Sequence, residues 1–150
     1  MANAQIAAKD AVYKGMQNFK EAIMSEIECA QIAKVISYDD KKHIADIQPL
    51  AVSPDGQQSA QYLDVPVSAN CYLMDEFIDS LKSGESWLKQ NGISLPKKKL
   101  MKKGAIVITV VLDNDSTNWD GSGNTFDTDT SRLHDANDAI VIGVLGGDIF

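Results

Sequence analysis

The stretch AIVITVVL at residues 105–112 decides the fold of this chain, because it is the most strand-like segment of the sequence. β-Branched residues dominate it, and every residue except Thr109 is apolar. A short apolar run of this kind is typical of a central strand that is buried on both faces. A second run of the same texture, AIVIGVL at residues 139–145, predicts the last strand of the chain.

Three shorter strands are predicted earlier in the sequence. Residues 29–37 and 43–52 are rich in Ile, Val and Ala, and the polar segment 38–42 between them is typical of a hairpin turn. The sequence SPDG at 53–56 predicts a second turn, after which apolar residues alternate with others over 63–67. These connections are too short for parallel crossovers, so we expect antiparallel neighbours.

Two segments have the spacing of helices. Residues 2–25 carry an apolar stripe at intervals of four, three and four residues, which fits either a short coiled-coil seam or an amphipathic helix docked on its own domain. Residues 73–90 also have one apolar side, with a break or kink expected at Gly84 and an end at Asn91-Gly92. The first stripe comprises Val12, Met16, Phe19 and Ile23, and the second comprises Met74, Phe77, Ile78, Leu81 and Leu88, with Trp87 adjacent.

The order of these elements predicts a mainly β protein with helices. A helix, three strands, a helix and two strands fit a small five-stranded Greek-key barrel better than an alternating βα sheet. The barrel has a helix between strands three and four and is preceded by the N-terminal amphipathic helix. We divide the chain into an N-terminal assembly or docking helix, residues 1–25, and one barrel domain, residues 26–150.

The charge of the chain argues against a general nucleic-acid binder. Its 150 residues include 21 acidic and 14 basic residues, for a net charge of −7, and Arg132 is the sole arginine. Nucleic-acid affinity comes largely from basic residues on phosphates, so no nucleic-acid site is expected. The longest apolar run, 105–112, is far shorter than a membrane span, and the N-terminus has no signal-peptide pattern. Stable membrane insertion is therefore not expected either.

The cysteines and histidines do not form a recognisable site. Cys29 and Cys71 lack metal-type spacing, and we expect both to be reduced and buried, as in a protein made in the cytoplasm. His43 and His134 lie outside any zinc or iron motif. A nucleophile pair of Cys71 with either histidine stays open, although a core cysteine and surface histidines are the simpler interpretation. No catalytic, cofactor-binding or metal residue is assigned, and we expect no enzyme activity and no cofactor.

A long polar loop, residues 113–138, separates the last two predicted strands and contains seven aspartates. It does not fit the EF-hand pattern, because Asn118 and Asn124 stand where that pattern requires glycine and glutamate. A cation held by clustered oxygens is a second interpretation, which the sequence leaves open. Arg132 is the one base in this loop, and we expect it to pair with aspartates such as Asp113 or Asp115 and so hold the loop to the barrel.

Four segments together resemble the phage Gp138 N-terminal domain family, over about residues 27–146. They are VISYDDKKHIADIQPLAV (35–52), LDVPV (63–67), KKGAIVITVVLDNDSTNW (102–119) and SRLHDANDAIVIGVL (131–145). Members of that family are oligonucleotide/oligosaccharide-binding (OB) barrels at the base of tail spikes. The matching features are Gln48-Pro49, Val65-Pro66-Val67, Gly104, Asp113, Trp119, Arg132-x-His134 and Asp138-Ala139-Ile140.

The resemblance implies an OB-fold-like barrel and a structural role. Family membership implies a homotrimer at the baseplate hub of a phage tail or tail-like injection machine, where it plugs the tail tube and carries or adapts the tip. The implied partners are baseplate hub and tail tube proteins, with a separate tip protein as a further candidate. The implied location is the tail of the virion, after assembly in the host cytoplasm.

The sequence departs from fuller family members, which continue into a β-helical needle with a metal-binding HxH tip. This sequence has no such repeats and no HxH, so a hub plug or adaptor fits it better than a piercing needle. The alternative function is an OB-fold module that binds single-stranded nucleic acid or an oligosaccharide. Such modules use aromatic platforms and basic grooves, whereas aromatics make up 7% of this chain.

Overall fold

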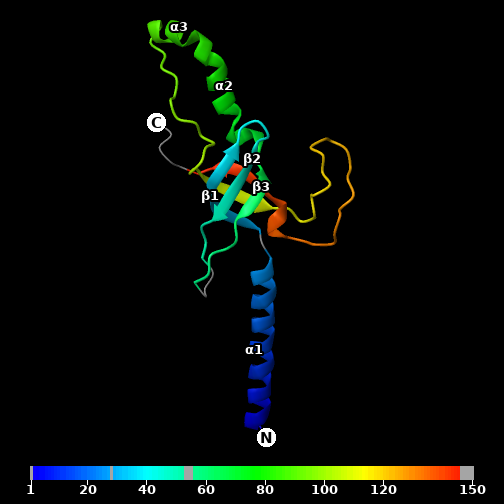
Figure 1. Ribbon diagram of the computed structural model, residues 1–150. Coiled ribbons are helices and arrows are strands. Elements are labelled where there is room, and N and C mark those ends of the chain that lie inside the picture. Colours follow the sequence, from blue (N-terminus) through cyan, green and yellow to red (C-terminus); the bar gives the residue numbers. More distant parts are fainter. Residues whose placement is uncertain (1, 28, 53–55, 146–150) are drawn as a thin grey trace.

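The computed structural model of the chain describes residues 2–27, 29–52 and 56–145. An N-terminal helix leads into five strands, and a helical segment lies between the third and fourth strands (Figure 1). The strands are β1 (Ala30–Asp39), β2 (Ile44–Pro49), β3 (Tyr62–Pro66), β4 (Ile106–Val111) and β5 (Ala139–Val144). The helices are α1 (Ala2–Glu26), α2 (Leu73–Leu81) and α3 (Glu85–Gln90), with short 3-10 turns η1 (Ala69–Cys71), η2 (Lys82–Gly84) and η3 (Ala136–Asp138).

The five strands form one antiparallel sheet in the order β3-β2-β1-β4-β5. The sheet curls so that its two edge strands approach each other at one end. There Val67, just after β3, bridges Val141 of β5 in parallel, and Ser68 N donates to Val141 O at 2.8 Å. An N-terminal helix, a curled half-barrel of five strands and a helix between β3 and β4 confirm the predicted fold, which is consistent with an OB-like fold.

The long strand β1 gives the sheet its curl. Its first half pairs with β4 and its second half with β2, and Ala33 has partners on both sides, Val107 and Pro49. The register between β1 and β2 shifts between Val35 and Ser37. An irregularity of this kind bends a strand and increases its twist, so one strand can serve both halves of the barrel.

The core of the half-barrel comes from every second residue of the strands. In β4, Val107, Thr109 and Val111 are buried, whereas Ile106, Ile108 and Val110 are only half-buried. The expectation that this strand is buried on both faces was therefore wrong, because only its inner face meets the packed core. Thr109 is tolerated inside the core because its hydroxyl donates to Gln31 O.

Three other expectations need correction or concern residues outside the described chain. Cys29 is exposed, because it precedes β1 at the rim of the sheet, whereas Cys71 is buried as expected. The second strand, β2, ends at Pro49, before the predicted boundary at Val52. Residues 53–55 of the predicted SPDG turn lie outside the described residues.

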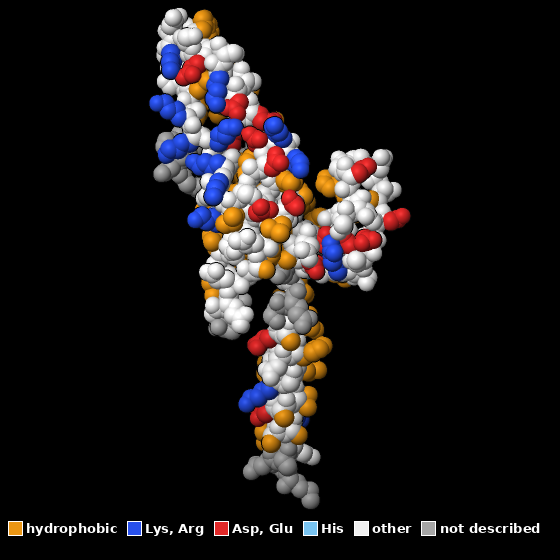
Figure 2. Space-filling view, in the orientation of Figure 1, with side chains coloured by type: hydrophobic (Ala, Val, Ile, Leu, Met, Phe, Trp, Pro, Cys, Tyr) orange, Lys and Arg blue, Asp and Glu red, His pale blue; other side chains and the backbone are white. Residues whose placement is uncertain are grey.

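The helices project from opposite ends of the half-barrel (Figure 1). α1 extends away from the sheet as a single rod, with hydrophobic side chains along one of its edges in Figure 2. α2 and α3 project from the other end, and the predicted break at Gly84 is the 3-10 turn η2 between them. Within the described ranges, no helix is long and apolar enough to cross a membrane.

Replacing Val107 with aspartate tests the core assignment. Val107 is 0% exposed, so Val107→Asp buries a carboxylate without a partner, and we expect it to abolish folding. Ile108→Asp is the matched control. Ile108 is only half-buried, so the carboxylate of an aspartate at this position can reach water. We expect the control to remain folded with a lower urea midpoint. Circular dichroism and urea unfolding check both, and a folded Val107→Asp protein would contradict the assignment.

Candidate functional site

The best-defined polar cluster of the structure surrounds Arg132, at the point where the long loop rejoins the barrel. Arg132 Nε donates to Asp138 Oδ2 at 2.9 Å, and its Nη2 donates to Asp138 Oδ1 at 3.1 Å and to Asp115 Oδ1 at 2.9 Å. Asp115 and Asp138 are 0% and 2% exposed, whereas Arg132 is partly exposed. One guanidinium group thus pairs with two buried carboxylates, and the three groups together keep a net charge of −1.

Each of the two carboxylates has further donors. Asp115 accepts from the backbone N–H and the hydroxyl of both Thr117 and Thr130. These hydrogen bonds, and secondarily the charge of Arg132, hold the pKa of Asp115 far below its usual range. Asp138 accepts from Ser116 N and Oγ, and the hydrogen bond from Arg132 is the main cause of its lowered pKa. Both groups therefore remain ionised at neutral pH.

The predicted pairing of Arg132 with a loop aspartate is confirmed for Asp115. It was wrong for Asp113, whose exposed carboxylate instead lies 3.6 Å from His134 Nδ1. The sequence analysis missed the contribution of Asp138, which is buried at the start of β5. The Asp-x-Thr spacing at Asp115 and Thr117 is a local turn pattern that could have indicated the inward direction of Asp115.

Removing the guanidinium group should destabilise the barrel. We expect Arg132→Ala to lower the melting temperature by roughly 5 °C, because two buried carboxylates lose their counter-charge. Arg132→Lys keeps the charge but loses the planar fork, so it should recover part of the difference. Differential scanning calorimetry measures the change, and an unaltered melting temperature for Arg132→Ala would reject the role of this cluster.

The same cluster predicts how stability depends on pH. The pKa values of Asp115 and Asp138 are lower in the folded chain than in the unfolded chain, so their contribution is complete above about pH 5 and is lost as the pH falls below about 4. We expect the urea midpoint to decrease over that range. Asp115→Asn, which cannot titrate, should show a shallower decrease, and an equal slope for the variant and the natural chain would contradict the assignment.

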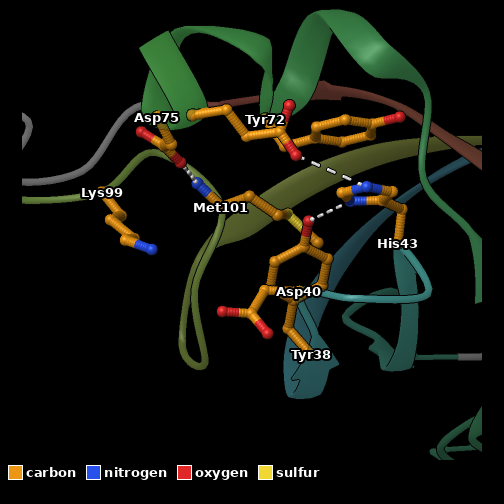
Figure 3. Close-up of a pocket in the computed structure, with 8 residues that line it drawn as sticks. Tyr38, Asp40, His43, Tyr72, Asp75, Lys99 and Met101 are labelled. Atoms are coloured by element: carbon orange, nitrogen blue, oxygen red, sulfur yellow. Dashed lines mark hydrogen bonds and ion pairs between the residues drawn. The ribbon is translucent and has the colours of Figure 1, made fainter. Parts of the chain in front are cut away.

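A second polar group forms around His43, in the turn between β1 and β2 (Figure 3). The imidazole ring stacks on Tyr72, with centroids 3.7 Å apart, and its nitrogens lie 3.3 Å from Tyr38 Oη and 3.4 Å from Glu76 Oε1. Burial, reinforced by nearby Tyr72 and acidic groups, raises the pKa of Tyr38 to about 12, so its phenol stays protonated. The cavity beside this group holds about 20 Å³, which is room for a water molecule but not for a substrate.

The structure does not bring Cys71 and a histidine together as a nucleophile pair. The Cys71 thiol donates to Asn70 Oδ1 at 3.5 Å, and burial raises the pKa of this thiol, which disfavours the reactive thiolate. Among the residues that the structure describes, no hydrogen bond joins Cys71 to His43 or His134. In the same part of the chain, no three acidic, histidine or cysteine side chains cluster as metal ligands.

Helix α2 has an unusual orientation, because its polar side faces its own chain. Asp75 is 6% exposed and accepts from Leu100 N and Met101 N, each at 2.9 Å. Asp79 pairs with Lys99 of the same connector at 2.9 Å. The opposite side of the helix, which we name the α2 outer face, therefore points to solvent. It consists of Leu73, Met74 and Phe77, which are 54–61% exposed.

Helix α1 has the second exposed apolar surface. The predicted stripe, which we name the α1 stripe, consists of Val12, Met16, Phe19 and Ile23, and these residues are 42–69% exposed. Single exposed apolar residues are ordinary, but a contiguous row of them marks an interaction surface. The stripe is not docked on its own barrel (Figure 1), so the choice between its two interpretations favours contact with another chain.

A scan against models of known protein families finds no match, and a search of curated proteins finds no significant match either. The class of this protein is therefore defined by its structure alone. The chain is an OB-like half-barrel with an ion-paired loop and two exposed helical surfaces. The resemblance to the Gp138 family adds a role to this class, and that role remains a proposal.

Proposed function

We propose that this chain is a structural, non-enzymatic part of a phage tail or tail-like injection machine. Three copies of the barrel plug the tail tube at the baseplate hub and carry or adapt the tip. The observation that carries the proposal is the combination of a closely filled half-barrel with two apolar helical surfaces that its own chain leaves exposed, the α1 stripe and the α2 outer face. Such surfaces are stable in water when another chain covers them.

The ionisable residues support a structural role rather than catalysis. Arg132 is paired with Asp115 and Asp138, and Asp75 and Asp79 hold the connector against α2. The cavities beside His43 and beneath α2 measure about 20 Å³ each. Groups that already satisfy one another in so little space leave no open position for a reacting molecule.

The role that we propose is mechanical. A plug on the axis of a tube must keep its shape until the baseplate rearranges. The curled sheet supplies a rigid body, because β1 hydrogen-bonds to strands on both sides. The Arg132 cluster supplies a second constraint, because it ties the long loop to the start of β5. The proposed partners are hub and tail tube proteins, which would contact the exposed helices.

The runner-up function is a binding module for single-stranded nucleic acid or an oligosaccharide. In OB barrels, the loop between the fourth and fifth strands contributes to ligand binding. Here that loop exposes Trp119 and Phe126, at 44% and 43%, which favours this reading. The same loop, however, carries seven aspartates and one arginine, and this charge repels a polyanion. The Trp119 indole N–H is also engaged by Ser122 O.

Electron microscopy of labelled particles tests the proposed function. Antibodies against this chain, with gold-labelled secondary antibodies, would be applied to purified phage or tail-like particles from cells that encode it. We expect gold at the tail tip or baseplate. Native mass spectrometry of the isolated chain should show a trimer, or a complex with the hub protein when the two are mixed.

Two results would contradict the proposal. Gold that is absent from tails, together with a strict monomer at high concentration that does not bind hub protein, would exclude the tail role. Retention of an oligonucleotide in a low-salt gel-shift assay, or binding to a glycan array, would favour the binding module. Loss of that retention in Trp119→Ala would assign it to the loop.

A further inference from the structure

We propose that the α1 stripe of one copy docks onto the α2 outer face of a second copy. This inference deepens the proposed homotrimer and rests on it, because it names the two surfaces that join neighbouring subunits. Within one chain these surfaces lie at opposite ends of the half-barrel (Figure 1). Because α1 points away from the barrel and from α2, a contact between the two surfaces forms between chains.

The two surfaces match in kind and in length. The α1 stripe extends over Val12–Ile23, or about 16 Å of helix, and α2 is about 13 Å long. Leu73, Met74 and Phe77 form an open apolar surface on α2, against which large side chains such as Phe19 and Met16 can pack. Packing of an amphipathic helix against an apolar surface is a common mode of protein recognition.

Charge favours this pairing over contact between like helices. Glu76 is the one charged residue beside Leu73, Met74 and Phe77 on this surface, and it also lies 3.4 Å from His43 Nε2. At 100° per residue, Lys9 and Lys20 lie at one edge of the α1 stripe, on the side of Met16. Two α2 faces in contact would bring Glu76 side chains together, and two α1 stripes would do the same with lysines. A contact of α1 with α2 brings opposite charges together.

The polar side of α2 faces inward, which explains why the α2 outer face stays available for contact. Asp75 and Asp79 are bonded to the connector on the opposite side of the helix. The helix therefore cannot turn its apolar side inward without losing these bonds. The α1 stripe and the α2 outer face are different surfaces, and each copy has one of each. The contact between copies is therefore heterologous. Heterologous contacts close into a ring when the rotation between copies allows it, as a trimer requires.

Complementation between two variants tests the proposal. Phe19→Asp damages only the α1 stripe and Phe77→Asp damages only the α2 outer face, and both residues are largely exposed, so folding should survive. Each variant alone should associate about 30-fold more weakly than the natural chain. A mixture of the two should recover dimers, because an intact α1 stripe from one variant meets an intact α2 outer face from the other. Native mass spectrometry counts the subunits, and circular dichroism verifies the fold of each variant.

Matched controls lie close in sequence to the two surfaces but off them. Asn18→Asp, next to Phe19 but on another side of α1, and Ser83→Asp, in the turn η2 that follows α2, should leave association unchanged. A trimer that persists in Phe77→Asp and is lost in Phe19→Asp would show contact between α1 helices and overturn the inference while leaving the trimer intact. A monomeric natural chain would overturn both the inference and the trimer. Recovery of dimers by mixing, without gold on tails, would support the inference and reject the tail role.

Discussion

The structure depends on β1, because this single strand hydrogen-bonds to both halves of the sheet. Ala33 has partners in β2 and in β4 at once, and the change of register after Val35 bends the strand between them. The bend brings the end of β3 toward β5, where Val67 and Val141 meet. The core is therefore enclosed by a curved sheet rather than covered by a helix, and α1, α2 and α3 are left free to face outward.

The second constraint is electrostatic. The connection between β4 and β5 has 27 residues, and a polar segment of this length gains little from hydrophobic burial. Asp115 and Asp138 bind it near its two ends, and Arg132 joins them. Burying two carboxylates is favourable only because the guanidinium group and the neighbouring threonines and serine satisfy them. Two of the seven aspartates of this loop, Asp115 and Asp138, thus serve its internal structure.

The orientation of α2 links the fold to the proposed function. In most surface helices the apolar side packs inward, but here buried Asp75 and paired Asp79 take the inner positions. Leu73, Met74 and Phe77 are left in solvent at one end of the molecule, and the α1 stripe is left in solvent at the other. In the contact that we propose, these two ends meet between copies of the chain.

Much of the fold follows from the sequence alone. The sequence predicts the five strands and the helix that follows the third of them. The signals are the alternation of apolar residues, the β-branched runs at 105–112 and 139–145, and the turn residues between strands, which act over a few residues. The isolated spacing of Val12, Met16, Phe19 and Ile23 likewise predicts α1. The sole arginine in an acidic loop was enough to predict a pairing with Asp115.

Tertiary structure decided what depends on direction and distance. The sequence marks an apolar side on residues 73–90, but only the connector that bonds Asp75 through Leu100 and Met101 determines that this side faces outward. It also decided that Asp138, rather than Asp113, is the second partner of Arg132, and that Ile108 lies on the less buried face of β4. Periodicity specifies which residues share a face, whereas contacts between distant segments specify what that face meets.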